Sequence, residues 1–287
     1  MTPAARRWHD WLAEGRERLA RAGIDEAENK VRWVAAHVLD CGLLDVLRHL
    51  PEVPGPAQAE RFAAALARLE NDEPVQYVVG ETDFMGLKIR CDARALIPRP
   101  ETEALVACAE EFLRGRERPF VVDACTGSGC IACALAKRVP GARVVATDLS
   151  AAALELAREN ARALGADVEF RQADLLAGLP EAGADLVVSN PPYVATAEIA
   201  RLDRTVRAFE PHLALDGGPD GLRTISRLVA EAAHVLKSDG MLMMEIGEDQ
   251  AAAIKEILCQ TSHLQFQRLK FDCAGKCRVA QARRRAR

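Results

Sequence analysis

The sequence predicts an α/β fold, a mostly parallel sheet flanked by helices, with a small helical domain before it. Apolar residues recur at helical spacing through residues 1–73, whereas short apolar runs alternate with helical patterns from residue 120 onward. One such run, residues 185–189, leads directly into Asn-Pro-Pro-Tyr at 190–193. Alternating strands and helices are typical of parallel sheets, whose ligands bind at the carboxyl ends of the strands.

Residues 1–73 are predicted to form the helical domain. Three amphipathic stretches carry its apolar face, with Trp8, Trp11, Leu12 and Leu19 in the first, Val31, Val34, Ala35, Val38 and Leu39 in the second, and Phe62, Leu66 and Leu69 in the third. Prolines between residues 51 and 56 separate the second stretch from the third. All three tryptophans of the chain lie here, and we expect them in the core rather than on a partner-binding face.

Residues 74–95 predict a β-hairpin connector. Val75, Tyr77 and Val79 alternate with other residues, and a second apolar alternation follows around Gly86. Prolines and acidic residues between 98 and 103 then predict the start of a helix. Within it, we interpret Arg99 as a residue able to reach a carboxylate or shape a pocket.

The first strand of the sheet, residues 120–123, runs into a tight loop at 124–130. Gly127 and Gly129 allow backbone amides to approach a ligand beside the start of the next helix. Cys125 stands where another glycine would complete a GxGxG pattern. The second strand ends at Asp148, a carboxylate placed to bind the two hydroxyls of a ribose. A nucleoside cofactor is therefore predicted across the first two strands.

The third strand, residues 168–171, is followed by Asp174, which could accept a hydrogen bond from an adenine amino group or serve as a turn or helix-capping residue. After the fourth strand, residues 195–221 predict a long polar loop that covers the site or binds substrate. A helix at 222–236, a strand at 241–246, a helix at 250–258 and an antiparallel pair at 264–271 and 278–281 complete the sheet.

The fourth strand delivers Asn190 to the edge of the sheet. Pro191 and Pro192 fix their own φ angles and keep Asn190 out of the helical region, and they remove the amide donors next to the carbonyls of residues 190 and 191. With the side-chain oxygen of Asn190 and the flat face of Tyr193, these acceptors can hold a planar NH2 group by both hydrogens. The pattern predicts alkylation of an amide or an exocyclic amine, and its structural alternative is a Pro-Pro turn with Tyr193 in the core.

Composition narrows the classes of function. A net charge of −4 gives no overall attraction to nucleic acid, and the basic tail at 283–287 is expected to be solvated. The charged first twenty residues contain no signal-peptide core, and no apolar run is long enough to span a bilayer, so we expect a cytoplasmic protein.

The nine cysteines are scattered, which favours free thiols over a disulfide framework. Cys130 and Cys133 have CxxC spacing and with Cys273 and Cys277 suggest a zinc site, but the first pair falls inside a predicted helix. We interpret these cysteines as small core residues. The six histidines form no ligand-spaced cluster, and we predict no metal.

From about residue 25 to residue 281 the chain resembles the class I S-adenosylmethionine-dependent methyltransferases, and more closely the family that methylates the glutamine side chain of peptide chain release factors. The motifs that carry the resemblance are PVQYVVG (74–80), LIPRPETEALV (96–106), DACTGSGCIA (123–132), SNPPYV (189–194), FEPHLAL (209–215), GGPDGL (217–222) and MEIGEDQ (244–250).

The resemblance implies a Rossmann-like seven-stranded methyltransferase sheet at 96–282 and an N-terminal helical domain that engages the protein substrate. It implies S-adenosylmethionine as methyl donor and the glutamine of the Gly-Gly-Gln motif of class I release factors as acceptor. The implied cofactor-binding residues are Asp123, Cys125, Thr126, Gly127, Ser128, Gly129, Asp148, Asp174, Leu175 and Asn190. Asn190 and Pro191 would hold the glutamine amide, and Pro192 and Tyr193 would wall its slot.

Other functions stay open on the sequence alone. The sister family acting on a ribosomal protein glutamine is disfavoured because PRPETE stands in place of PRSP and an apolar residue. An N6-adenine nucleic-acid methyltransferase would use the same motif, but a basic target-recognition domain is missing. A dinucleotide-dependent dehydrogenase lacks its complete GxGxxG. A cofactor-binding scaffold without activity is the non-enzymatic alternative.

Overall fold

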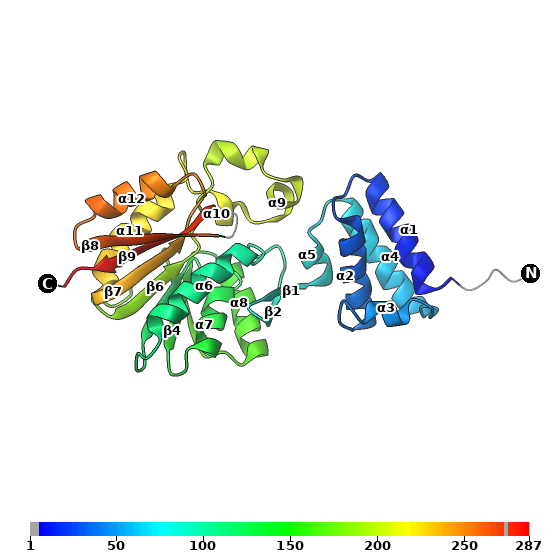
Figure 1. Ribbon diagram of the computed structural model, residues 1–287, viewed down its shortest axis with the longest axis horizontal. Helices are drawn as coiled ribbons and strands as arrows, with labels where there is room; N and C mark the ends of the chain where they lie inside the picture. Colours follow the sequence, from blue (N-terminus) through cyan, green and yellow to red (C-terminus); the bar gives the residue numbers. More distant parts are fainter. Residues whose placement is uncertain (1–5, 273–274, 287) are drawn as a thin grey trace, which may run out of the picture. The chain divides into compact units, whose positions relative to one another are not determined.

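The computed structural model describes residues 6–272 and 275–286. The chain divides into two compact units, one made of Met1–Glu81 with Asp203–Phe209 and the other of Thr82–Leu202 with Glu210–Arg287 (Figure 1). The first unit is helical and the second contains the seven-stranded sheet.

The helices of the first unit are α1 (Trp8–Arg21), α2 (Ala27–Leu39), α3 (Val46–His49), α4 (Pro56–Glu70), α5 (Val75–Val79) and α9 (Arg204–Phe209). Their core is aromatic at one end, where the rings of Trp8 and Phe62 meet edge to face with centroids 5.4 Å apart. The expectation for the tryptophans is wrong for Trp33, which is 39% exposed. It lies on α2 off the stripe that buries Val31 and Val34.

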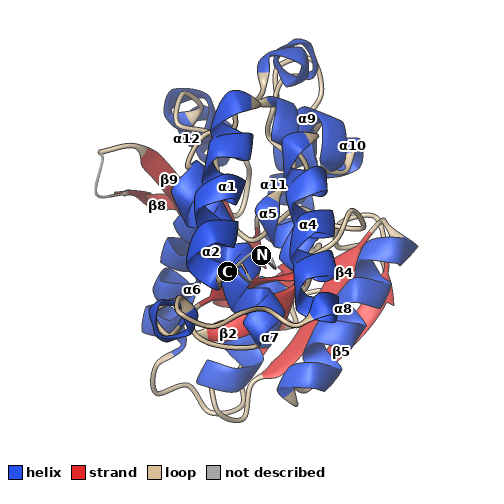
Figure 2. Cartoon of the chain, turned by 90° about the vertical axis from the view of Figure 1, so that its right-hand side faces the viewer, coloured by secondary structure: helices blue, strands red, loops and turns tan. Residues whose placement is uncertain are grey.

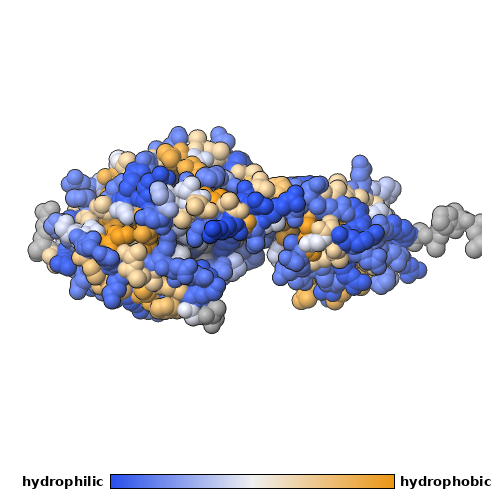
Figure 3. Space-filling view, turned by 90° about the horizontal axis from the view of Figure 1, so that it is seen from above, coloured by the Kyte–Doolittle hydropathy of each residue, from blue (hydrophilic) through white to orange (hydrophobic). Residues whose placement is uncertain are grey.

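Some large apolar side chains of the first unit face solvent. They are Trp33, Leu43, Leu44, Leu47 and Val53. Figure 3 shows apolar patches of this kind within a mainly hydrophilic surface.

The strand predicted from the alternation of Val75, Tyr77 and Val79 is wrong, because these residues form the short helix α5. Pro74 precedes the helix, and Gly80 ends it at a φ of 82°, with its N–H donating to the carbonyl of Gln76 at 2.8 Å. A run of only five residues is compatible with both the two-residue period of a strand and the period of a helix. Val75 and Val78 are both buried in the core of the first unit, which is the spacing of a helix.

The predicted hairpin follows α5 and is confirmed. Strands β1 (Glu81–Phe84) and β2 (Leu87–Arg90) form a two-stranded sheet. The two residues between them, Met85 and Gly86, have φ angles of 54° and 77°. Positive φ at both central positions is what a two-residue hairpin turn of type I′ requires.

The large sheet has the strand order β5-β4-β3-β6-β7-β9-β8. Its strands are β3 (Phe120–Ala124), β4 (Arg143–Asp148), β5 (Val168–Gln172), β6 (Ala184–Ser189), β7 (Leu236–Glu245), β8 (Leu264–Phe271) and β9 (Cys277–Arg284). Strands β3 to β7 pair in parallel, whereas β9 is antiparallel to both neighbours. The paired β8 and β9 are also visible in Figure 2. The seven-stranded Rossmann-like prediction is confirmed.

Helices cover both faces of this sheet, as Figure 1 shows. Helices α6 (Pro100–Leu113), α7 (Cys130–Arg138) and α8 (Ala151–Leu164) pack on one face, and α11 (Arg223–Val235) and α12 (Ala251–Gln260) on the other. Because side chains alternate along a strand, Leu186 and Val188 of β6 join the core of the first face while Val187 joins that of the second. Burial on both faces explains the uninterrupted apolar run of this strand.

Residues 195–221 are not the unstructured loop that their polarity predicts. They contain the 3₁₀ helix η1 (Thr196–Arg201), α9 and the short helix α10 (His212–Leu215). The glycine-rich turn that follows returns to the end of β6, where the N–H of Gly217 donates to the carbonyl of Val194 at 2.8 Å.

The solvated tail predicted at 283–287 is also wrong for its first two residues, which belong to β9. Arg284 is buried, and its guanidinium donates to the carbonyls of His234 and Leu236. The aliphatic stem of an arginine can extend a strand into a core while its charged group reaches carbonyl oxygens. Arg287 lies outside the described residues.

Candidate active site

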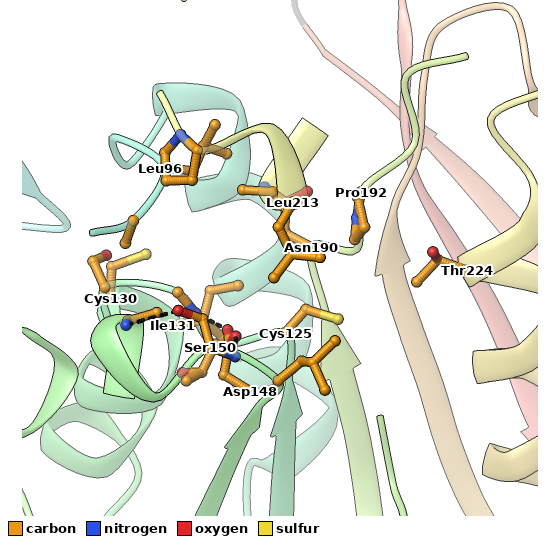
Figure 4. Close-up of a pocket in the computed structure, with 18 of the residues that line it drawn as sticks. Leu96, Cys125, Cys130, Ile131, Asp148, Ser150, Asn190, Pro192, Leu213 and Thr224 are labelled. Atoms are coloured by element: carbon orange, nitrogen blue, oxygen red, sulfur yellow. Dashed lines mark hydrogen bonds between the residues drawn. The ribbon is translucent and has the colours of Figure 1, made fainter. Parts of the chain in front are cut away.

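A cavity of about 320 Å³ opens at the carboxyl ends of the parallel strands (Figure 4). The chain passes from β3 outward to β5 and then returns to place β6 on the other side of β3. Loops leaving β3 and β6 therefore diverge, and such a point of reversal is where open α/β sheets bind ligands. Pairing of Ala124 with Ser189 sets Cys125 and Asn190 at the same level of the sheet.

Most of the residues predicted for the site line this cavity. Those that do are Cys125, Thr126, Gly127, Ser128, Asp148, Asp174, Leu175, Asn190 and Pro192. The predicted residues that do not line it are Asp123, Gly129, Pro191 and Tyr193. Of these, Asp123 is fully buried, so it can act on the site only through its neighbours.

Asp123 is fully buried beneath the loop after β3. Its Oδ2 accepts hydrogen bonds from the hydroxyl of Thr126 at 2.6 Å and from the N–H of Ala132 at 3.1 Å, which tie the loop to α7. Its Oδ1 has no hydrogen-bond partner within the described residues. Burial raises the pKa of Asp123 to about 7, against the lowering effect of the two hydrogen bonds.

Gly129 and Cys125 both have positive φ angles, of 79° and 57°. A Cβ at Gly129 would stand 2.9 Å from the Cβ of Ala157, so this glycine lets α8 approach the loop. Cys125 adopts the left-handed conformation although it carries a side chain, which is uncommon outside glycine, asparagine and aspartate. The loop thus keeps a glycine-like backbone at Cys125.

Both oxygens of Asp148 are fixed by the backbone. Oδ2 accepts from the N–H of Gly127 and Oδ1 from the N–H of Ser150, each at 2.8 Å. Burial raises the pKa of Asp148, and the hydrogen bonds partly oppose that rise. Each carboxylate oxygen retains acceptor capacity, so the group suits a pair of neighbouring hydroxyls.

Asp174 lies half-exposed at the rim of the cavity beyond β5. Its Oδ2 accepts from Nη2 of Arg227 on α11 at 2.8 Å, and both residues line the cavity. The ion pair leaves Oδ1 available to a second donor, such as an amino group. Leu175, with a φ of 51°, is buried beside it.

Asn190 is linked to two buried polar side chains. Its Nδ2 donates to Oγ1 of Thr102 at 3.2 Å, and Thr102 in turn donates to Oε2 of Glu245 at 2.6 Å. Glu245 is 2% exposed, and burial raises its pKa. Of this group, the sequence pattern identifies only Asn190 as a site residue, since Thr102 and Glu245 lie inside the motifs at 96–106 and 244–250 without a chemical signal of their own.

Tyr193 is held by Glu245 and by Gln250, which follows shortly after it. The hydroxyl of Tyr193 donates to Oε1 of Glu245 at 3.3 Å, and burial raises its pKa. Nε2 of Gln250 donates to the carbonyls of Tyr193 at 2.9 Å and Gly221 at 3.2 Å. Gly221 has a φ of 74°, and a Cβ there would stand 2.3 Å from the carbonyl oxygen of Tyr193.

The interpretation of Arg99 is confirmed. Its guanidinium contacts the carboxylate of Glu210, which is buried and also accepts from the N–H of Ile97 at 3.1 Å. Arg99 and Ile97 both line the cavity. Glu210, from the motif FEPHLAL, therefore holds the segment before α6 against the cavity.

No cluster of three or more histidine, cysteine or acidic residues suited to a metal occurs within residues 6–272 and 275–286. Cys130 and Cys133 are buried in α7, which confirms them as core residues, and burial raises the pKa of the Cys133 thiol to about 12. Cys273 of the alternative zinc site lies outside the described residues. None of the described helices is long and apolar enough to cross a membrane.

The residues present fit a nucleoside cofactor with a charged amino-acid end. The carboxylate of Asp148, which lines the cavity and is held by backbone amides, suits a ribose. The space above Gly127 is open, since a Cβ there would meet only Ala95, at 3.9 Å. The cavity volume is in the range usual for small-molecule sites.

Comparisons with known proteins agree with this geometry. Residues 10–80 match the family model described as PrmC N-terminal domain, and residues 102–218 match the methyltransferase small domain. The release factor glutamine methyltransferase of Deinococcus radiodurans is 42% identical over 275 residues, which cover 96% of this chain and 98% of the relative. That of Moorella thermoacetica is 41% identical over 282 residues, covering 96% and 97%.

A solved methyltransferase from Pyrococcus furiosus has the same fold. It superposes with a TM-score of 0.53 at 17% identity, covering 81% of this chain and all of that one. At this identity the likeness supports the fold alone.

Proposed function

Since this chain belongs to the release factor glutamine methyltransferase family, we propose that it transfers a methyl group to the side-chain amide nitrogen of a glutamine in a peptide chain release factor. S-adenosylmethionine is the methyl donor of this methyltransferase. The observation that carries the proposal is that Asn190 reaches into the same cavity as the loop 125–128 and Asp148.

We assign the cofactor to the ends of β3, β4 and β5. The loop 125–129 would receive its methionine end, Asp148 its ribose, and Asp174 with Leu175 its adenine. When bound there, the cofactor supplies a methyl group on a positively charged sulfur, which departs as a neutral thioether once that methyl is bonded to nitrogen.

An amide nitrogen is a weak nucleophile because its lone pair is delocalised into the carbonyl. In our proposal Oδ1 of Asn190 and the carbonyl of Pro191 accept the two hydrogens of the glutamine NH2, while Pro192 and Tyr193 enclose it. This fixes the nitrogen in line with the methyl group, and such positioning can supply roughly 7–11 kcal/mol of a barrier. The nitrogen gains the methyl and releases one proton to water, so no separate base is needed.

For the acceptor we propose the glutamine of the Gly-Gly-Gln motif in class I release factors, engaged with help from the helical first unit. Exposed apolar residues on that unit, Leu44 and Leu47 among them, support a protein partner. We place this reaction in the cytoplasm. The net charge of −4 gives no overall attraction to nucleic acid, which supports a reaction without direct contact to it.

The test is incubation of the protein with labelled S-adenosylmethionine and purified release factors, followed by mass spectrometry to locate the label. We expect one methyl group on the glutamine of the Gly-Gly-Gln motif and none on a release factor in which that glutamine is replaced. Label on DNA, on a ribosomal protein, or on no glutamine would contradict the proposal.

A further inference from the structure

Two motifs without an assigned role, residues 96–106 and 244–250, meet behind Asn190. Thr102 lies in the first turn of α6, and Glu245 is the last residue of β7. They are 2% exposed each, and Thr102 Oγ1 lies 2.6 Å from Glu245 Oε2 and 3.2 Å from Asn190 Nδ2. The three side chains form a continuous chain of hydrogen bonds from the core to the cavity.

The direction of these hydrogen bonds follows from their chemistry. Glu245 receives a hydroxyl group on each oxygen, Thr102 on Oε2 and Tyr193 on Oε1, which is the pattern of a carboxylate that only accepts. Thr102 thus donates its hydroxyl hydrogen to Glu245. The lone pairs of the Thr102 hydroxyl oxygen remain free to accept a hydrogen bond from another donor. Asn190 can supply that donor only with its NH2 group, so its Oδ1 is the atom left for the cavity.

We propose that Thr102 and Glu245 are positioning residues that fix the amide of Asn190 with Oδ1 toward the acceptor. The inference rests on the proposed function, because only an acceptor with an NH2 group requires an oxygen there. A reversed amide would set the Asn190 NH2 against the substrate NH2, two groups that both donate. It would also set Oδ1 against a threonine oxygen whose hydrogen is already used.

The same carboxylate also holds the far end of the motif. Oε1 of Glu245 binds the hydroxyl of Tyr193, while Gln250, five residues later, binds the Tyr193 carbonyl. Asn190 and Tyr193 are therefore anchored to one rigid strand end. The buried carboxylate of Glu245 therefore sets both the orientation of the Asn190 amide and the position of the Tyr193 side chain.

The experiment compares Thr102→Val, which keeps the shape but loses the hydroxyl, with Thr102→Ser, which keeps the hydroxyl. At saturating S-adenosylmethionine and release factor we expect kcat of Thr102→Val to fall roughly 100-fold, as for a misplaced reacting group. Thr102→Ser should stay within about threefold of the wild type, because the hydrogen bonds persist. The Kd for S-adenosylmethionine, measured by calorimetry, should be unchanged in both.

A double-mutant cycle separates positioning from general packing. If Thr102 acts through Asn190, Thr102→Val should have no further effect on the residual rate of Asn190→Ala, since interacting residues are non-additive. The inference would be overturned if Thr102→Val kept the wild-type kcat or if Thr102→Ser lost as much kcat as Thr102→Val. It would also be overturned if the losses of kcat were additive in the double variant.

A second measurement needs neither a variant nor a substrate. In the cofactor-free wild type, NMR should show a nuclear Overhauser effect between the side-chain NH2 of Asn190 and the methyl group of Thr102. Its absence would overturn the inference even if Thr102→Val failed to fold. Failure of the wild type to methylate any release factor, with this effect present, would reject the proposed function and leave the orientation established.

Discussion

Asp148, at the end of β4, is held by backbone amides of two nearby loops, those of Gly127 and Ser150. Asn190, at the end of β6, is instead held by side chains from distant parts of the chain: Thr102 lies 88 residues before it, and Glu245 stands at the end of β7. The half of the cavity at β3 to β5 is built mainly from backbone amides and carboxylates that follow strands in succession. The half at β6 and β7 is built from buried side chains. Binding a cofactor needs complementary groups, but reaction at an amide needs one precise orientation.

The largest effect on activity should come from the half of the cavity at β6 and β7. Asn190→Ala removes the acceptor for the glutamine NH2, and loss of one such preorganised group costs roughly 100- to 1,000-fold in kcat. The Kd for S-adenosylmethionine should change less than about threefold, because Asp148 and the loop remain. Quantitative methylation assays and calorimetry measure the two, with the exposed Asn71→Ala as control. Near wild-type methylation by Asn190→Ala would show that the half of the cavity at β6 and β7 is not needed to orient the acceptor amide.

Asp123, the buried acid beneath the loop after β3, should make the stability of the protein depend on pH. Because the pKa of Asp123 is raised from 3.8 to about 7 in the folded protein, the folded state keeps a proton that the unfolded chain has lost between these values. The free energy of unfolding should therefore fall as pH rises through this window. A shift of about three pKa units corresponds to roughly 4 kcal/mol.

Urea unfolding of the cofactor-free protein at several pH values from 4.5 to 8 provides the measurement. Asp123→Asn, which stays neutral throughout, is the control, and the wild type should lose stability relative to it as pH rises. Parallel curves for the two proteins would show that Asp123 does not carry this proton.

Asp148→Ala should have the opposite effect to Asn190→Ala, weakening cofactor binding while leaving kcat nearly unchanged. It removes two charge-assisted hydrogen bonds to the proposed ribose, and we expect the Kd for S-adenosylmethionine to weaken about 100-fold, or roughly 3 kcal/mol. At saturating cofactor, kcat should remain within a few-fold of the wild type. Asp167→Ala, at an exposed position, is the matched control for both measurements. A fall in kcat without a change in Kd would reverse the assignment.

The smallest effect is expected at Cys125, where the two halves meet. Cys125→Gly relieves a left-handed conformation at the cost of some packing, so its stability should stay within about 1 kcal/mol of the wild type. Cys125→Val places a β-branched residue at the same φ and should lose roughly 1–3 kcal/mol. Thermal unfolding of the pair tests this, and equal stabilities would mean that the backbone of the loop rearranges.

The half of the cavity at β3 to β5 was predictable from sequence as far as its parts are local, which excludes the ion pair of Asp174 with Arg227. An apolar run that ends at Gly127 or at Asp148 encodes the strand, its end and the group placed there. The order of these runs along the chain also gives the order of the first strands. No knowledge of distant contacts is needed to place the carboxylates at one edge.

The side-chain half could be predicted only as far as Asn190. Thr102 and Glu245 are separated by 143 residues, and nothing in either segment specifies that they meet. The same holds for Arg99 and Glu210, 111 residues apart. At α5 the failure is of another kind, since five residues are too few to distinguish a period of two from a helical one.

Gly221 restricts how the acceptor specificity of this enzyme can be changed. A Cβ at Gly221 would stand 2.3 Å from the carbonyl oxygen of Tyr193 and 2.8 Å from Nε2 of Gln250, so any side chain is excluded there. The same Nε2 donates to the carbonyls of both Tyr193 and Gly221. A library that varies only residues 190–193 would leave the neighbouring turn at 217–221 unchanged, and this turn limits how far the acceptor slot can change shape. Reshaping the slot for a larger amine requires simultaneous variation of the turn at 217–221, so the two segments form one unit of design.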